Sequence, residues 1–333
     1  MGRLAAAILF CLLGTVLHAA DTGWTLARSP HFEVYSHAGG REAREVLVWF
    51  ERLRGFFEDQ TGIKVDARLP LRILVFSSTE EYAPFRPSPT ADAYFATSSN
   101  ADYVVLPTPD ADRLSAHEYW HFVAHKGGLR LPLWLNEGLA EFFSTVQLEA
   151  KGGRMGVAPP LHISLLRFHS WIGLPALLAA TPGSHILRER ETAGVFYAES
   201  WALTHMLKLS PAYARRFPEL MNRLNGGMPS QQALEATYGR SADAIGNDLR
   251  GWFLKGRSAP VPAARSEIAP MDLSQASSSA IRSLLNAIRS TADLPDQAEA
   301  REPTPGNAGS LIAAQSPAFA SGMRISWSLY CSW

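Results

Sequence analysis

The stretch that decides the fold has five residues, His117-Glu118-Tyr119-Trp120-His121. The residues around it predict one helix, which Asp110 can cap and which runs to about Lys126 before a pair of glycines. Histidines four positions apart project from the same helix face, so both imidazoles can bind one metal ion. Glu118 leans towards the same point and can take a proton from a water molecule that the metal activates.

A catalytic zinc ion usually has three protein ligands and one open position, so a third ligand is needed. The next helix, predicted over residues 134–149, carries Glu137 on its first turn, where it can point back across the loop. Gly138 costs a helix about 1 kcal/mol relative to alanine, which makes sense where two helices approach closely. Glu141, one turn later, can accept a hydrogen bond from a ligand histidine and fix its tautomer. The alternative for both carboxylates is a solvated helix face.

Together these segments resemble a known family. His117-Glu118-x-x-His121 followed by Asn136-Glu137-Gly138-x-Ala140-Glu141 is similar to the motifs of the gluzincin zinc peptidases. Within that family, the motifs most resemble those of the aminopeptidase branch and of short, single-domain bacterial relatives in the peptidase MA-like group. The resemblance implies a zincin-like fold that binds Zn²⁺, with ligands His117, His121 and Glu137. It also implies Glu118 as catalytic base and Glu141 as the support of a ligand histidine.

A downstream segment, Phe196-Tyr197-Ala198-Glu199, resembles the place where that branch carries a catalytic tyrosine. The resemblance implies that Tyr197 donates its hydroxyl to the oxyanion at the scissile carbonyl, and a phenol suits this because it donates without a full charge. The alternative is an aromatic side chain packed in a helical core.

One family feature is absent. The Gly-Ala-Met-Glu-Asn segment that holds the substrate amine in aminopeptidases has no counterpart, because residues 101–106 offer only Asp102. No aminopeptidase activity is therefore predicted, and we expect this strand to be a sheet edge to which an extended peptide adds. His125 is expected near the site or at the surface, while His205 and His162 are expected in the core or at the surface rather than as ligands.

The hydrophobic pattern divides the chain into four parts. Residues 1–20 have a basic start, an apolar run and small residues at the end, which is typical of a cleavable signal peptide and predicts a secreted or periplasmic protein. Residues 21–110 predict an α/β part and residues 111–256 a mainly helical, metal-binding part. Residues 257–333 are rich in Ser, Ala and Pro, so we expect a largely disordered tail with one short helix near 278–289.

The predicted class is α+β, with the metal site between a small mixed sheet and the helical half. The expected elements are strands at 32–35, 71–76, 93–97 and 102–106, a helix at 41–60 ending at Gly62, one that Ser78 and Glu81 begin as a capping box, and helices at 160–180, 193–208, 211–225, 229–237 and 241–255.

Charge restricts the partners. The 31 basic and 31 acidic residues give a formal net charge of +0, so no basic field attracts nucleic acid or anionic lipid. No run after the signal peptide is long and apolar enough to span a bilayer. We expect a peptidase acting on a peptide or protein substrate. The alternative is a catalytically silent zincin-fold protein that binds or scaffolds in the cell envelope, where the tail and helices could also form an interaction module.

Overall fold

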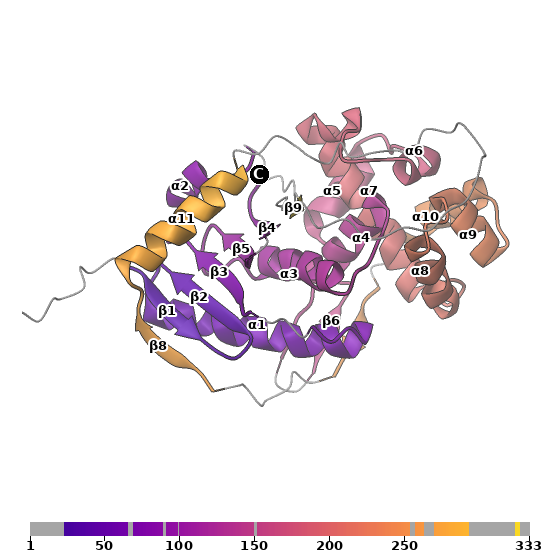
Figure 1. Cartoon of the computed structure of the whole chain (residues 1–333). Coiled ribbons are helices and arrows are strands. Elements are labelled where there is room, and N and C mark those ends of the chain that lie inside the picture. The colour runs from indigo at the N-terminus through magenta and orange to yellow at the C-terminus, as the bar shows by residue number, and fades with distance from the viewer. Residues whose placement is uncertain are drawn as a thin grey trace, which may run out of the picture.

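The computed structural model describes residues 23–292 and 324–326, except for the short stretches 66–68, 89–90, 99, 150–151, 254–256 and 263–269. The expected signal peptide and most of the expected tail lie outside these residues. The chain has a mixed α+β fold, with a sheet on one side and a group of helices on the other (Figure 1).

The sheet has seven strands in the order β8-β1-β2-β3-β5-β4-β9. The central strands β2, β3 and β5 are parallel, and the flanking strands are antiparallel to their neighbours. Most residues of β3 and β5 are buried, which agrees with their largely apolar sequences, LRILV and DYVVL. The strands are β1 (Thr25–Arg28), β2 (Phe32–Ser36), β3 (Leu71–Val75), β4 (Tyr94–Thr97), β5 (Asp102–Leu106), β8 (Asp272–Gln275) and β9 (Arg324–Ser326).

The prediction that residues 101–106 form a sheet edge is wrong. The strand β5 in this stretch is flanked by β3 on one side and β4 on the other, so its backbone is already paired on both sides. β4 follows it in the sheet order and is itself paired with β9. Strand order depends on how distant segments cross over, which the alternation within one strand does not encode.

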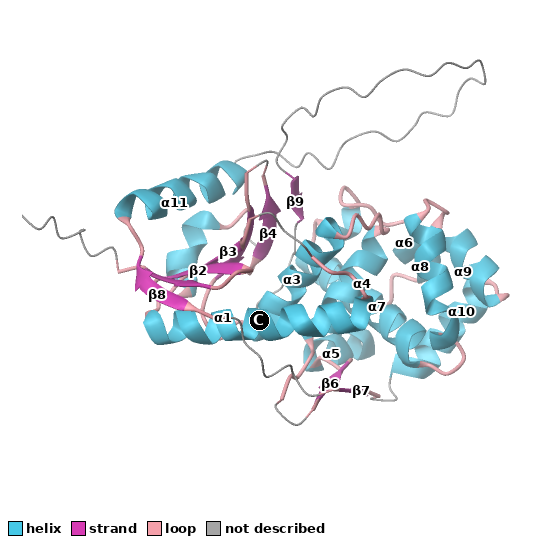
Figure 2. Cartoon of the chain, turned by 60° about the horizontal axis from the view of Figure 1, so that its bottom comes forward, coloured by secondary structure: helices cyan, strands magenta, loops and turns pink. Residues whose placement is uncertain are grey.

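Helices cover both faces of the sheet (Figure 2). On one face lie α1 (Gly40–Thr61) and α3 (Asp112–Lys126), and α1 ends as predicted at Gly62, whose φ of 70° is the left-handed conformation that favours glycine. On the other face lie α11 (Ser278–Ala292), α2 (Thr79–Tyr82) and the turn η1 (Ala83–Phe85). The Ser78 hydroxyl caps α2 by accepting from the Glu81 N–H at 3.3 Å, as expected.

The disordered tail expected from residue 257 onwards is wrong for β8 at residues 272–275, whereas the short helix expected near 278–289 is present as α11. β8 pairs with β1 along its whole length, and α11 buries Ile281, Leu284 and Ile288 against the sheet. These three residues follow helical spacing, and the sheet supplies the apolar face that makes the amphipathic helix part of the folded body.

The helical half surrounds α7, which is buried along most of its length. The predicted helix at 134–149 ends at Ser144, and the one at 160–180 is two helices separated by residues 169–173. None of the helices in the described ranges has the length and apolarity needed to cross a membrane. The elements here are α4 (Leu133–Ser144), α5 (Pro160–Phe168), α6 (Leu174–Leu178), η2 (His185–Leu187), α7 (Arg190–Leu209), η3 (Ala214–Arg216), α8 (Phe217–Asn225), α9 (Ser230–Tyr238), α10 (Ala242–Trp252) and a small antiparallel pair of strands, β6 (Gly153–Met155) and β7 (Ala259–Val261).

Candidate metal centre

The helix α3 places polar residues inside the core. It lies between the sheet and α4, and every residue from Ser115 to Ala124 is buried. The expected cap at Asp110 is wrong: the residue before the first turn is Ala111, which makes no side-chain cap hydrogen bond. Asp112 lies within the first turn, where a negative charge interacts favourably with the helix dipole.

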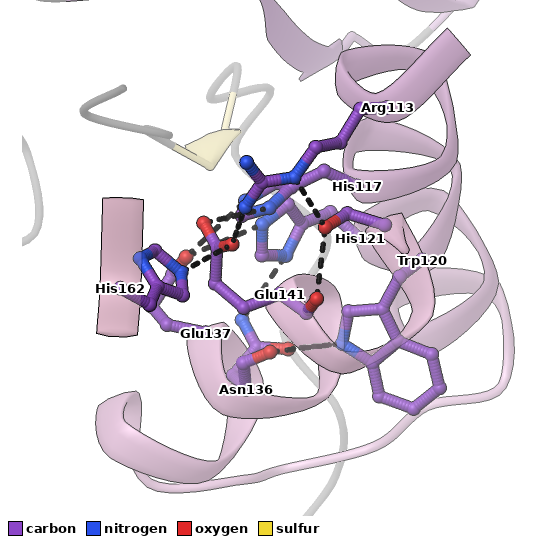
Figure 3. Close-up of polar contacts among 9 residues, drawn as sticks. Arg113, His117, Trp120, His121, Asn136, Glu137, Glu141 and His162 are labelled. Carbon is purple, nitrogen blue, oxygen red and sulfur yellow. Dashed lines mark hydrogen bonds and ion pairs between the residues drawn. The ribbon is translucent and has the colours of Figure 1, made fainter. Parts of the chain in front are cut away.

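Three ligand atoms converge between α3 and α4 (Figure 3). Glu137 Oε2 lies 3.5 Å from His117 Nε2 and 3.6 Å from His121 Nε2. These separations exceed those of an ordinary hydrogen bond. Two ligands at about 2.0 Å from a tetrahedral zinc ion lie about 3.3 Å apart, close to what is found here. The spacing therefore fits three ligands of one ion better than three groups bonded to one another.

Burial supports the same interpretation. The three ligand side chains are at most 2% exposed, so water does not solvate them. His121 Nε2 and Glu137 Oε2 have no hydrogen-bond partner among the described residues. Buried polar atoms without partners are costly, and a bound cation would satisfy both atoms. The predicted ligand set of His117, His121 and Glu137 is therefore brought together as a group that can hold a metal ion.

Glu141 supports His117 from the side away from Glu137. Its Oε1 lies 3.4 Å from His117 Nδ1, the ring nitrogen that does not face the ligand group. Burial lowers the pKa of His117, but the carboxylates of Glu137 and Glu141 outweigh this effect and raise that pKa to about 10. Burial raises the pKa of Glu141, yet its interactions with His162 and Arg113 reverse this and hold that pKa well below its usual range. The structure places Glu141 beside His117, at a separation longer than an ordinary hydrogen bond, and its role as the support of a metal ligand stays a prediction.

Asn136 contacts the second ligand histidine. Its Nδ2 lies 3.3 Å from His121 Nδ1, while Trp120 Nε1 donates to both Asn136 Oδ1 and the Asn136 backbone oxygen. Asn136 therefore links His121 to Trp120 of the same helix, and the direction of its contact with His121 depends on the tautomer of the ring.

Gly138 permits a close helix approach, as its sequence position suggested. The partner is α7: a Cβ at Gly138 would lie 2.4 Å from the backbone oxygen of Ser200 and 2.2 Å from Thr204 Oγ1. The absence of a side chain thus lets α4 pack directly on the backbone of α7. Because Glu137 precedes this glycine, the same contact fixes the depth at which its carboxylate sits.

The structure places the other expected residues as follows. Glu118 is fully buried on α3, and its negative charge contributes to the raised pKa of His117. Tyr197 is buried on α7, where its ring lies 5.5 Å from that of Phe196. The catalytic roles of Glu118 and Tyr197 stay predictions.

The remaining histidines divide into surface and core. His125 is exposed one turn after His121 and packs against the ring of Phe95, so it lies at the surface. His205 is a core residue that accepts from Trp252 Nε1 at 2.8 Å.

Two contributors were missed at the sequence level. His162 was assigned to the core or the surface, yet its Nε2 lies 2.9 Å from Glu141 Oε2. No local pattern could reveal this, because the two residues are joined only by the packing of α5. Arg113 Nη2 lies 2.7 Å from the same oxygen, and its position four residues before His117 on one helix face was a usable signal.

Comparison of the chain with protein-family models and with curated proteins finds no match. The geometry of the metal centre and the motif are therefore the features that indicate a function.

Proposed function

We propose that this chain is a zinc-dependent peptidase of gluzincin type with a zincin-like fold. His117, His121 and Glu137 bind its zinc ion. The observation that carries the proposal is the convergence of Nε2, Nε2 and Oε2 in a buried group at 3.5 and 3.6 Å. Two imidazoles and one carboxylate are a donor set that zinc accepts in hydrolytic sites, where a fourth position stays open. The expected secretion remains part of this proposal.

Electrostatics favour a divalent ion. Glu118, Glu137 and Glu141 are each at most 2% exposed, and Arg113 is the guanidinium that contacts this group. With all four side chains ionised and the histidines neutral, the local charge is −2, which a divalent cation cancels. Uncompensated charge in such a buried place is strongly unfavourable, so the residues fit the ion that the motif predicts.

The chain's own residues would carry out the proton transfers. When bound, zinc supplies a Lewis acid that polarises a carbonyl and makes water a stronger acid. The Glu118 carboxylate takes a proton from the attacking water as its oxygen bonds to the scissile carbonyl carbon. Glu118 then returns this proton to the leaving amine nitrogen as the C–N bond breaks. The Tyr197 hydroxyl donates to the oxyanion, and Glu141 keeps His117 oriented throughout.

The test compares four proteins that all begin at residue 21: wild type, Glu118→Gln, His121→Ala and His125→Ala. Zinc per chain is measured for each, and a broad peptide library is assayed for cleavage. We expect one zinc ion and cleavage in wild type, zinc without cleavage in Glu118→Gln, and neither in His121→Ala. His125→Ala is the matched control, because it removes an exposed imidazole from the same helix and should change nothing.

Each part of the proposal can fail separately. Zinc that persists in His121→Ala would remove the site assignment. Full cleavage by Glu118→Gln would remove the assigned base. Stoichiometric zinc with no cleavage by wild type would reject the peptidase and favour the alternative of a silent zincin-fold binding protein.

A further inference from the structure

The carboxylate of Glu141 joins side chains from three helices. Its Oε1 faces His117 Nδ1 at 3.4 Å. Its Oε2 lies 2.7 Å from Arg113 Nη2 and 2.9 Å from His162 Nε2. Arg113 and His117 belong to α3, Glu141 to α4 and His162 to α5 (Figure 3).

Because the two oxygens have different partners, the orientation of the Glu141 carboxylate is fixed. Rotation about the bond to the carboxyl group would take Oε2 away from two short contacts, of which one is a charge-assisted hydrogen bond. Oε1 is thereby kept in front of His117 Nδ1. An imidazole that donates from Nδ1 has its lone pair on Nε2, and Nε2 is the atom that faces Glu137 and His121.

The two donors are held in turn. Arg113 Nε donates to Ser144 Oγ at 3.2 Å, and this hydroxyl donates to the backbone oxygen of Glu141 at 2.8 Å. His162 is buried, and its ring lies 5.9 Å from that of Trp201 on α7. Neither donor is therefore free to follow Glu141 if the carboxylate turns, which is what a rigid support requires.

We propose that Arg113 and His162 are positioning residues of the metal centre, which act through Glu141 to hold His117 in the ring orientation and tautomer that bind the metal. This inference rests on the proposed function, because it needs a metal at His117. It assigns a role to α5, a helix that supplies no ligand.

The experiment measures the dissociation constant of Zn²⁺ by competition with a chromophoric chelator, and the visible absorption spectrum of the Co²⁺-substituted protein. Arg113→Met and His162→Leu should each weaken Zn²⁺ binding by roughly 10- to 100-fold and alter the Co²⁺ spectrum, which is the usual effect of losing such an outer contact. His162→Gln should stay within a few-fold of wild type, because its amide N–H can donate to Glu141 in place of Nε2.

Two controls separate positioning from general support of the fold. His205→Leu removes another buried histidine of the helical half, one bonded to Trp252 and to backbone oxygens rather than to the site. It should lower the unfolding midpoint and leave the Zn²⁺ dissociation constant unchanged. In a Glu141→Ala background, His162→Leu should have no further effect on that constant, because its route to His117 is gone.

Folded Arg113→Met and His162→Leu proteins that bind Zn²⁺ as tightly as wild type would overturn the inference while leaving the proposed function intact. So would an effect of His162→Leu that persists in full without Glu141. A wild-type chain that binds no Zn²⁺ would overturn the proposed function and the inference together.

Discussion

Gly138→Ala places one methyl group between α4, which carries Glu137, and α7, on which α4 packs. A Cβ at this position would lie 2.4 Å from the backbone oxygen of Ser200 and 2.2 Å from Thr204 Oγ1, whereas ordinary contact begins at 3.4 Å. The hydroxyl of Thr204 can rotate away. The backbone of α7 cannot, so α4 and α7 must separate by about 1 Å at this point.

The expected loss follows from two opposing effects. Alanine favours a helix interior by about 1 kcal/mol over glycine. Overpacking against a fixed backbone costs typically 1–3 kcal/mol and occasionally more, and this contact lies at the severe end of that range. We expect a net loss of about 1–2 kcal/mol in the free energy of unfolding. Because metal–ligand distances tolerate only about 0.2 Å, a shift of Glu137 with its helix should also weaken Zn²⁺ binding at least tenfold.

The assay is urea unfolding of the metal-free protein together with chelator competition for Zn²⁺. The matched control is Gly246→Ala on α10, where the new Cβ would meet only Leu174 Cβ, at 3.7 Å. That variant should gain up to about 1 kcal/mol and bind Zn²⁺ as wild type does. The reasoning fails if Gly138→Ala is as stable as Gly246→Ala, or if it retains wild-type affinity.

Three further predictions address other parts of the fold. Burial raises the pKa of Glu199 from 4.5 to about 7, so the native state binds more protons than the unfolded state between these values. The free energy of unfolding should therefore fall as the pH rises through 7, by up to about 3 kcal/mol. Glu199→Gln should abolish that fall in urea titrations at pH 4.5 and 8. Ile288→Ala should cost about 2–4 kcal/mol in thermal unfolding, and an unchanged midpoint would mean that α11 is not part of the cooperative fold. Trp252→Phe removes the donor to His205 Nδ1 and should cost about 1–3 kcal/mol without changing Zn²⁺ affinity; a change in affinity would contradict the assignment of His205 to the core.

The sequence predicted what is local. Helix periodicity placed α1 and α7 to within a few residues, since the spacing of apolar side chains along one helix does not depend on distant segments. The same holds for the site: a separation of four positions between His117 and His121 on one helix suffices to bring their ring centroids to 5.0 Å. Glu137 was found because its helix follows after a short loop, which leaves few ways to fold back.

Contacts between segments that are distant in the chain were not predicted from the sequence. β8 pairs with β1 across most of the chain, and nothing in either four-residue strand specifies the other. The position of residues 101–106 inside the sheet was missed for the same reason. α11 was predicted as a helix, but whether an amphipathic helix is buried depends on an apolar face elsewhere. His162 reaches Glu141 only because α5 packs on α7, so its contact is a property of the assembled fold.

A buried cluster that can hold a metal ion is unfavourable without one. In the metal-free chain the raised pKa of His117 means that a proton on this ring supplies part of the missing positive charge between Glu137 and Glu141. A bound divalent ion would displace this proton and bring two charges where the proton brought one. Binding to the native state alone stabilises it in proportion to the logarithm of the free metal concentration. Metal binding is therefore coupled to the contacts that position the ligands, namely those of Glu141 and the packing of α4 on α7. Contacts that hold Glu137 and His117 in place without the ion lower the free-energy cost of arranging the ligands when the ion binds.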